Sequence, residues 1–197
     1  MKGRINKTKE GLTMKIRNNY LINEKTVLFY GEWNENGELF TFVIEGDDSF
    51  LVSMSPIKLI DKSLLSYGSN FIGALRSSRE LLGGNRKMYP IKIDASLDIW
   101  LFPTKSYKKE NCVWFALSHV KYTKRLGNKH TKVFLSYGHE FEIEMGESSF
   151  RNKRDITLDL RNIIYRNTKK SLNYVAVSQK QLIILEQEGQ FECKSNN

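Results

Sequence analysis

The chain has 197 residues, of which 40% are hydrophobic, 12% aromatic and 27% charged, so it can bury a core and is not disordered throughout. Its net charge of +9 at pH 7 favours a polyanionic partner such as nucleic acid. No apolar run approaches the roughly 18 residues that span a bilayer, and the start of the chain lacks a signal peptide's apolar stretch. We therefore expect a cytoplasmic protein without a membrane partner.

The first residues have the basic, polar composition of a flexible arm, and a predicted β-meander follows them. Residues 1–19 carry six cations among small polar residues and lack the apolar surface that a fixed fold requires, so we expect a flexible basic arm. β-branched and aromatic runs at 26–31 and 39–46 flank Asn36-Gly37, a pair that favours a hairpin turn. Two further short strands are expected, at 50–54 and 56–60.

A change of hydrophobic period predicts a helix at 69–82. Ser69 can cap this helix, its apolar residues recur on one face, and a Gly-Gly pair follows its end. The other face carries Arg76 and Arg79. Gly73 in the interior costs about 1 kcal/mol relative to Ala, which indicates a close contact with the sheet beneath it.

The middle of the chain is rich in strand patterns. Residues 112–120 are apolar at nearly every position, as expected of a central strand that is covered on both faces. A later hairpin alternates Glu140, Glu142 and Glu144, which predicts an acidic exposed face. The strands expected in this part are 90–94, 98–102, 112–120, 132–137 and 140–145.

A second helix is expected at 149–166, because Ser148 or Ser149 can cap it and apolar residues recur at helical spacing. A helical wheel places Arg151, Arg154 and Arg161 together on the side away from the apolar stripe, where they invite phosphates. Surface ion pairs with Asp155 and Asp159 are the structural alternative. One more strand is expected within 171–186.

These patterns predict an α+β fold: a β-rich single domain of mostly antiparallel strands with two helices, at about 69–82 and 149–166. The domain is expected at 20–188, between the basic arm at 1–19 and a disordered tail at 189–197.

The charges are unevenly distributed along the chain. Residues 27–56 hold six acidic side chains and no Lys or Arg. Between residues 105 and 132, by contrast, eight cations accompany a single acid, Glu110. Either zone alone is compatible with an ordinary solvated surface, but their separation predicts a molecule with a basic side and an acidic side.

Patterns for catalysis and metal binding are weak. His119, His130 and His139 lack the spacing of metal ligands, and two cysteines, Cys112 and Cys193, make neither a disulfide framework nor a zinc site. No phosphate loop or dinucleotide fingerprint occurs. We therefore expect a protein that is not an enzyme and that needs no cofactor or metal. A metal-dependent nuclease that uses Asp61 and Asp94 is an alternative, although each aspartate also suits a turn.

Several short motifs follow one another in a characteristic order from Ser53 to Arg166. They are Asp61-Lys62-Ser63, Tyr67-Gly68-Ser69 with Gly73, Pro90-Ile91, Leu101-Phe102-Pro103-Thr104, Cys112 with Trp114, and Ser149-Phe150. In this order and spacing the chain resembles the ComK family of competence transcription factors. It departs from the family at Ala74-Leu75, where basic residues are typical, and at Met88-Tyr89, where Lys-Pro is usual.

The resemblance implies an autoregulated transcription activator of DNA-uptake genes, which is expected to associate with the nucleoid. It implies binding to AT-rich boxes of double-stranded DNA, largely through the minor groove, by a homo-oligomer that is a dimer or a tetramer. RNA polymerase and a protease adaptor are left open as further protein partners.

Physical reasoning agrees with a minor-groove partner. A·T tracts narrow that groove and deepen its negative potential, which attracts Arg and Lys on loops and arms, while the three-arginine helix and the 105–132 zone suit phosphates. An RNA-binding protein is a further alternative, in which Tyr107 and Tyr122 would stack on unpaired bases. The candidate DNA-binding residues are Lys62, Arg76, Arg79, Lys105, Lys108, Lys109, Lys121, Lys124, Arg125, Lys129, Arg151, Lys153, Arg154 and Arg161.

Overall fold

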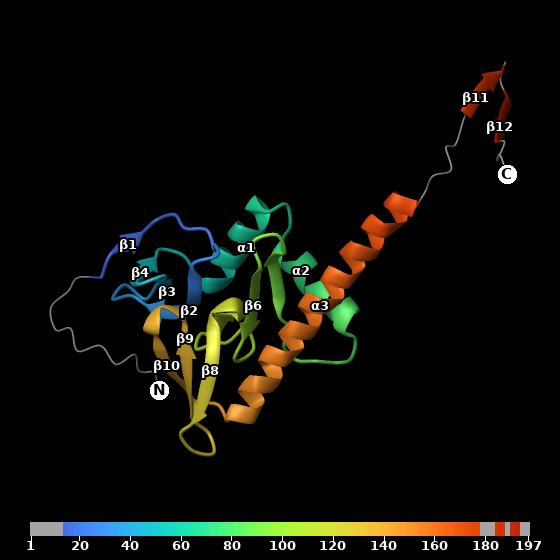
Figure 1. Ribbon diagram of the computed structural model, residues 1–197. Coiled ribbons are helices and arrows are strands. Elements are labelled where there is room, and N and C mark those ends of the chain that lie inside the picture. The colour runs from blue at the N-terminus through green and yellow to red at the C-terminus, as the bar shows by residue number, and fades with distance from the viewer. Residues whose placement is uncertain (1–13, 178–183, 188–189, 194–197) are drawn as a thin grey trace. The chain divides into compact units, whose positions relative to one another are not determined.

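The most apolar segments of the chain pair with one another in the centre of a seven-stranded sheet, which Figure 1 shows in a computed structural model. The structure describes residues 14–177, 184–187 and 190–193. It divides the chain into two compact units, one up to Arg161 and one from Asn162 onward. Each unit is described by itself.

The seven-stranded sheet of the first unit has the order β1-β4-β3-β2-β7-β6-β5. Its strands are β1 (Ile16–Arg17), β2 (Thr26–Trp33), β3 (Leu39–Glu45), β4 (Asp48–Val52), β5 (Ile91–Asp94), β6 (Ile99–Pro103) and β7 (Val113–Ala116). Neighbouring strands run antiparallel, except that β1 pairs in parallel with β4. The expected antiparallel meander is therefore present, within a mixed sheet.

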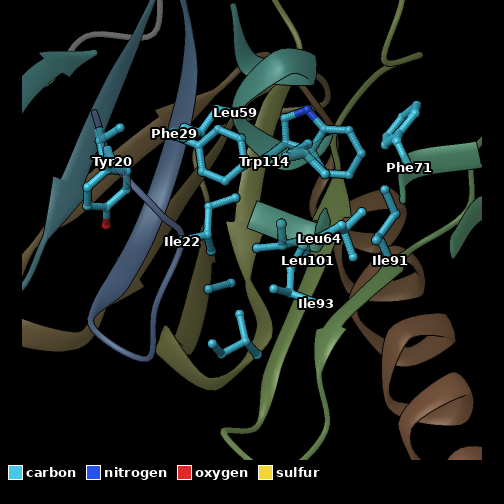
Figure 2. Packing of buried hydrophobic residues seen from close by; sticks show 14 of the residues in the cluster. Tyr20, Ile22, Phe29, Leu59, Leu64, Phe71, Ile91, Ile93, Leu101 and Trp114 are labelled. Carbon is cyan, nitrogen blue, oxygen red and sulfur yellow. The ribbon is translucent and has the colours of Figure 1, made fainter. Parts of the chain in front are cut away.

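Helices α1 (Pro56–Ser66) and α2 (Phe71–Leu82) contribute to the core on one face of this sheet. Figure 2 shows Leu59 and Leu64 of α1 packed among residues of β2, β6 and β7. Phe29 and Trp114 stack there with ring centres 6.3 Å apart. Burying each of these large side chains stabilises the fold by about 2 to 3 kcal/mol, so this cluster fixes α1 on the sheet.

A second core lies on the opposite face, because successive residues of a strand point to alternate sides. Phe115, which follows Trp114 in β7, contacts Phe102, Phe141 and Phe150 with ring centres 5.2 to 5.9 Å apart. Phe141 belongs to a three-stranded sheet of order β10-β9-β8, and Phe150 belongs to the first turns of α3. The bounds are β8 (Val120–Arg125), β9 (Thr131–Leu135), β10 (Glu140–Ile143) and α3 (Glu147–Val177).

The prediction of two helices was wrong, because the described residues contain three α-helices. Residues 56–60, expected as a strand, begin helix α1. Pro56 suits the first turn of a helix, and Leu59, Ile60, Ser63 and Leu64 are buried at helical spacing. The apolar run 56–60 was too short for its period to separate a strand from a helix.

Two predicted boundaries also differ from the structure. The expected central strand 112–120 is β7 followed by a 3-10 turn, Leu117–His119, and then the start of β8. Helix α3 extends to Val177, so residues 171–177 are helical where a strand was expected. Residues 178–183 of that predicted strand lie outside the described residues.

The predicted arm and the predicted tail are only partly described. Residues 1–13 and 194–197 lie outside the described residues. Ile16 and Arg17 pair with β4, and the Arg17 guanidinium lies 3.2 Å from Glu45, so this part of the arm is joined to the sheet. In the second unit, β11 (Ile184–Gln187) pairs antiparallel with β12 (Gln190–Cys193).

The start of α2 is held by two side chains. Asn70, not the expected Ser69, is the cap, and its Oδ1 accepts a hydrogen bond of 2.8 Å from the Gly73 amide. Asp61 of α1 accepts a hydrogen bond of 2.9 Å from the Phe71 amide. Gly73 is exposed, and a Cβ at that position would meet Asn70 and not the sheet, so the expected contact with the sheet is absent.

We predict that Asp61→Ala lowers the free energy of unfolding by roughly 1 to 2 kcal/mol, because the Phe71 amide loses its acceptor at a helix start. Urea unfolding measures this change. Asp61→Asn keeps an oxygen acceptor and should lose less than half as much. Equal stability of Asp61→Ala and the unaltered protein would show that the Asp61 bond does not support α2.

Candidate nucleic-acid interface

The structure places the fourteen predicted cations on elements that cover the two faces of the seven-stranded sheet, in the turn between β6 and β7, and, for Lys129, in the loop between β8 and β9. Lys62 lies on α1, and Arg76 and Arg79 lie on α2, beside the first core. The cations of β8 and α3 belong to the elements beside the second core. A turn between β6 and β7 carries Lys105, Lys108 and Lys109. The fourteen therefore do not form one continuous surface.

The largest group of exposed cations follows β8 and the loop after it. β8 is an edge strand of the three-stranded sheet, and its burial pattern leaves Lys121 and Lys124 exposed, as Lys129 is in the 126–130 loop. Within the described residues, none of these three lysines has a carboxylate partner. Lysines also protect edge strands from pairing with other chains, so their position fits both a structural and a binding role.

Three side chains join β8 to the first turn of α3. The Thr123 hydroxyl donates a hydrogen bond of 2.7 Å to Glu147, and Arg151 lies 2.7 Å from the same carboxylate oxygen. Arg151 also donates to the Thr123 hydroxyl at 3.2 Å. The hydrogen bond from Thr123, together with the Arg151 charge, holds the pKa of Glu147 below its usual range. Arg151 is thereby held beside Thr123 of β8.

The loop that joins β8 to β9 is held close to the start of α3. Arg125 donates to the Gly127 carbonyl at 3.2 Å and to Asn128. A Cβ at position 146 would lie 3.0 Å from the Asn128 carbonyl oxygen, so a glycine there permits this close approach. Leu126 at the tip is 45% exposed. We call Lys121, Lys124, Arg125, Lys129 and Arg151, with this loop, the hairpin–helix surface.

The expected acidic side lies at the other edge of the three-stranded sheet. Lys132 of β9 lies 2.9 Å from Glu140 and 3.7 Å from Glu142, so its charge is neutralised locally. His139 Nε2 lies 2.6 Å from the Gly46 carbonyl oxygen, which joins this edge to the turn that carries Asp47 and Asp48. Two hairpins that each carry acidic side chains are therefore in contact.

The three arginines of α3 do not form a common phosphate surface. Arg154 lies 3.3 Å from Asp155, which is the ion pair that the sequence offered as an alternative. Arg161 lies 2.9 Å from Asp98, in the turn before β6. Arg151 belongs to the hairpin–helix surface. Of the other predicted cations, Lys62 donates to Asn19 at 2.5 Å, the Arg79 guanidinium lies over Tyr89, and Lys105 lies 4.0 Å from Glu144.

A groove of about 440 Å³ lies beside the first turns of α3 and was not found from the sequence. Its lining is Arg86, Lys87, Met88, Pro90, Phe102, Pro103, Thr104, Met145, Ser149, Asn152, Lys153 and Ile156. Only Lys153 was among the predicted residues. Arg86 and Lys87 are exposed in the segment after α2, and their only sequence signal was a pair of adjacent cations. We call this the α3 groove.

The residues considered for a nuclease or an RNA-binding protein have structural partners. Asp94 accepts hydrogen bonds from Ser96 (2.5 Å) and Leu97 (2.9 Å), and the Ser96 bond lowers the pKa of Asp94. Tyr107 packs edge-on against Phe71. Among the described residues no group of three or more His, Cys, Asp or Glu could hold a metal ion. No helix in that part of the chain is long and apolar enough to cross a membrane.

The described residues thus define a β-rich α+β protein with a separated basic surface. The chain belongs to the ComK protein family, whose model matches residues 17–169. It is 32% identical over 134 residues to a protein of Bacillus subtilis (strain 168) named "Competence transcription factor", a match that covers 68% of this chain and 69% of that protein. No solved structure matches the chain.

We predict that Thr123→Val raises the pKa of Glu147 toward that of an ordinary carboxyl group, because the largest stabilising contact of the carboxylate is lost. Carboxyl carbon NMR measures the titration. Since the folded pKa is depressed, the contact stabilises the protein above the unfolded pKa, and this contribution disappears as the pH falls through the folded pKa. Thr168→Val should leave the Glu147 titration unchanged. An unchanged titration in Thr123→Val would contradict a hydrogen bond between Thr123 and Glu147.

Proposed function

We propose that the protein activates transcription of competence genes by binding AT-rich double-stranded DNA, largely through the minor groove. Membership of the ComK family and the name of the Bacillus subtilis relative support the role as a competence transcription factor. The observation that carries the DNA-binding mode is the composition of the loop at the tip of the hairpin–helix surface.

This loop combines the residue types that enter minor grooves. Proteins that bind there use Arg, Lys and Asn at the groove floor and often insert an apolar side chain between base steps. Here Arg125, Asn128 and Lys129 surround the partly exposed Leu126. The narrow groove of an A·T tract has the more negative potential, so it attracts this loop more strongly than a G·C segment does.

The flanking cations suit the phosphates on either side of such a groove. Lys121 and Lys124 lie on the edge strand that leads to the loop, and Glu147 holds Arg151 against Thr123 of the same strand. Contacts of this kind set position and supply affinity that depends on salt, whereas sequence preference comes from the groove. We propose the hairpin–helix surface, and not α1 and α2, as the DNA interface.

The alternatives have less support. A nuclease would need free converging carboxylates, but Asp61 supports α2 and Asp94 holds a turn. For RNA, Tyr122 is 57% exposed, but one side of its ring stacks on Phe134 with centres 4.2 Å apart. We retain the homo-oligomer as part of the proposal, with the acidic side as a surface for a protein partner such as RNA polymerase.

We predict that the protein binds an AT-rich duplex at least about tenfold more tightly than a GC-rich duplex of equal length, since groove width and potential differ. Fluorescence anisotropy across a salt series measures both affinities. A drug that occupies the A·T minor groove should displace the protein. Equal affinity for the two duplexes, or indifference to the drug, would refute minor-groove binding.

The same assay locates the interface. Lys124→Gln and Lys129→Gln should each flatten the slope of log K against log salt by about 0.9. Lys58→Gln removes one charge from the exposed side of α1 and is the matched control, which should leave the slope unchanged. A larger effect of Lys58→Gln would place the DNA on the α1 and α2 side.

A further inference from the structure

We propose that the α3 groove is a phosphate site that binds one phosphodiester of the DNA backbone, with Lys153 as its main cation. The inference rests on the proposed function and adds a second contact region to the hairpin–helix surface. Met145 lines the groove, and the adjacent Gly146 contacts the 126–130 loop. The α3 groove and the hairpin–helix surface therefore lie on either side of the segment that begins α3.

The charge of the groove favours an anion. Arg86, Lys87 and Lys153 line it, and among the described lining residues none is acidic. Within the described part of the chain, these three cations have no carboxylate within ion-pair distance. Three cations that line one groove repel one another, and a bound phosphate would relieve that repulsion.

Lys153 lacks the solvation that a lysine usually has. Its side chain is half-buried, and the polar contact of its Nζ is the Met88 sulfur at 3.4 Å. Burial lowers the pKa of Lys153. The nearby Cys112 thiol supplies no counter-charge, because burial raises the pKa of Cys112 to about 11 and leaves it neutral at pH 7. An anion in the groove would restore the lost solvation of the ammonium group.

The remaining lining suits a phosphodiester of a nucleotide chain. Ser149 and Asn152 supply a hydroxyl and an amide from the exposed side of α3, while Phe102 and Ile156 supply apolar walls. Polar groups beside apolar walls fit a phosphate with its attached sugar. A volume of about 440 Å³ lies in the range of small-ligand sites, so the groove also has room for a free phosphate compound. Such a compound carries the same phosphate group as DNA, and an experiment must distinguish the two ligands.

The test measures the salt dependence of AT-rich duplex binding for Lys153→Met and for the double variant Arg86→Gln, Lys87→Gln. Lys153→Met should weaken binding about tenfold and flatten the slope by about 0.9, and the double variant should flatten it by up to about twice that amount. Lys58→Gln is again the matched control. Replacing a half-buried charge with an apolar side chain does not destabilise the fold in this account, so thermal unfolding of Lys153→Met should match the unaltered protein.

A second arm titrates the unaltered protein with inorganic phosphate at constant ionic strength and records amide NMR shifts. Saturable shifts confined to Met88, Asn152 and Lys153, together with the altered slope, support the proposal. Such shifts with an unchanged slope in Lys153→Met assign the groove to a free phosphate compound and overturn its role on DNA. If neither effect is observed, the proposed site is overturned entirely. If the unaltered protein binds no duplex, the proposed function fails, and the phosphate titration still decides whether the groove binds phosphate.

Discussion

The structure of the first unit depends on one constraint, which is that the central sheet is apolar on both faces. Phe29 and Trp114 point to one side, and Leu28 and Phe115 point to the other. Each face must be covered, so α1 and α2 pack on one and the three-stranded sheet and the start of α3 pack on the other. The covering elements then present their outer sides to solvent. The exposed cations of the candidate interface lie on those elements and the turns between them, while Lys108 and Lys109 lie in the turn between β6 and β7 of the central sheet.

This arrangement pairs some cations with carboxylates and leaves others without such partners among the described residues, a difference that the composition alone cannot show. Lys132 is neutralised by Glu140 and Glu142, Arg154 by Asp155, and Arg161 by Asp98. The cations of β8 and its loop lack such partners among the described residues, and the hydrogen bond from Thr123 to Glu147 joins β8 to the start of α3. In the proposed function, a polyanion would therefore meet an interface that is already shaped, which lowers the ordering cost of binding. The proposed phosphate site in the α3 groove would extend this interface across the start of α3.

The sequence predicted much of the fold where its pattern was long or its turn chemistry was strong. The first hairpin, α2, the acidic β10 and the start of α3 were found close to their observed positions. Helix α1 was missed because the apolar run 56–60 is too short to distinguish a strand from a helix. The burial of Ser63 and Leu64, one turn further on, shows that the buried face has helical spacing. For the candidate site, charge density identified Lys121, Lys124 and Lys129. It could not show that Arg161 pairs with Asp98, or that Arg86 and Lys87 line the same groove as Lys153, because these residues are 63 to 67 positions apart in the chain.

The central claim is that DNA meets the hairpin–helix surface and the start of α3, and not the side formed by α1 and α2. Mass-spectrometric footprinting with an amine-reactive reagent, with and without an AT-rich duplex, tests it directly, because a bound phosphate blocks a lysine from reaction. The account predicts protection of Lys121, Lys124 and Lys129, while Lys58 and Lys62 react as in the free protein. Protection of Lys58 and Lys62, with Lys124 and Lys129 unchanged, would contradict it.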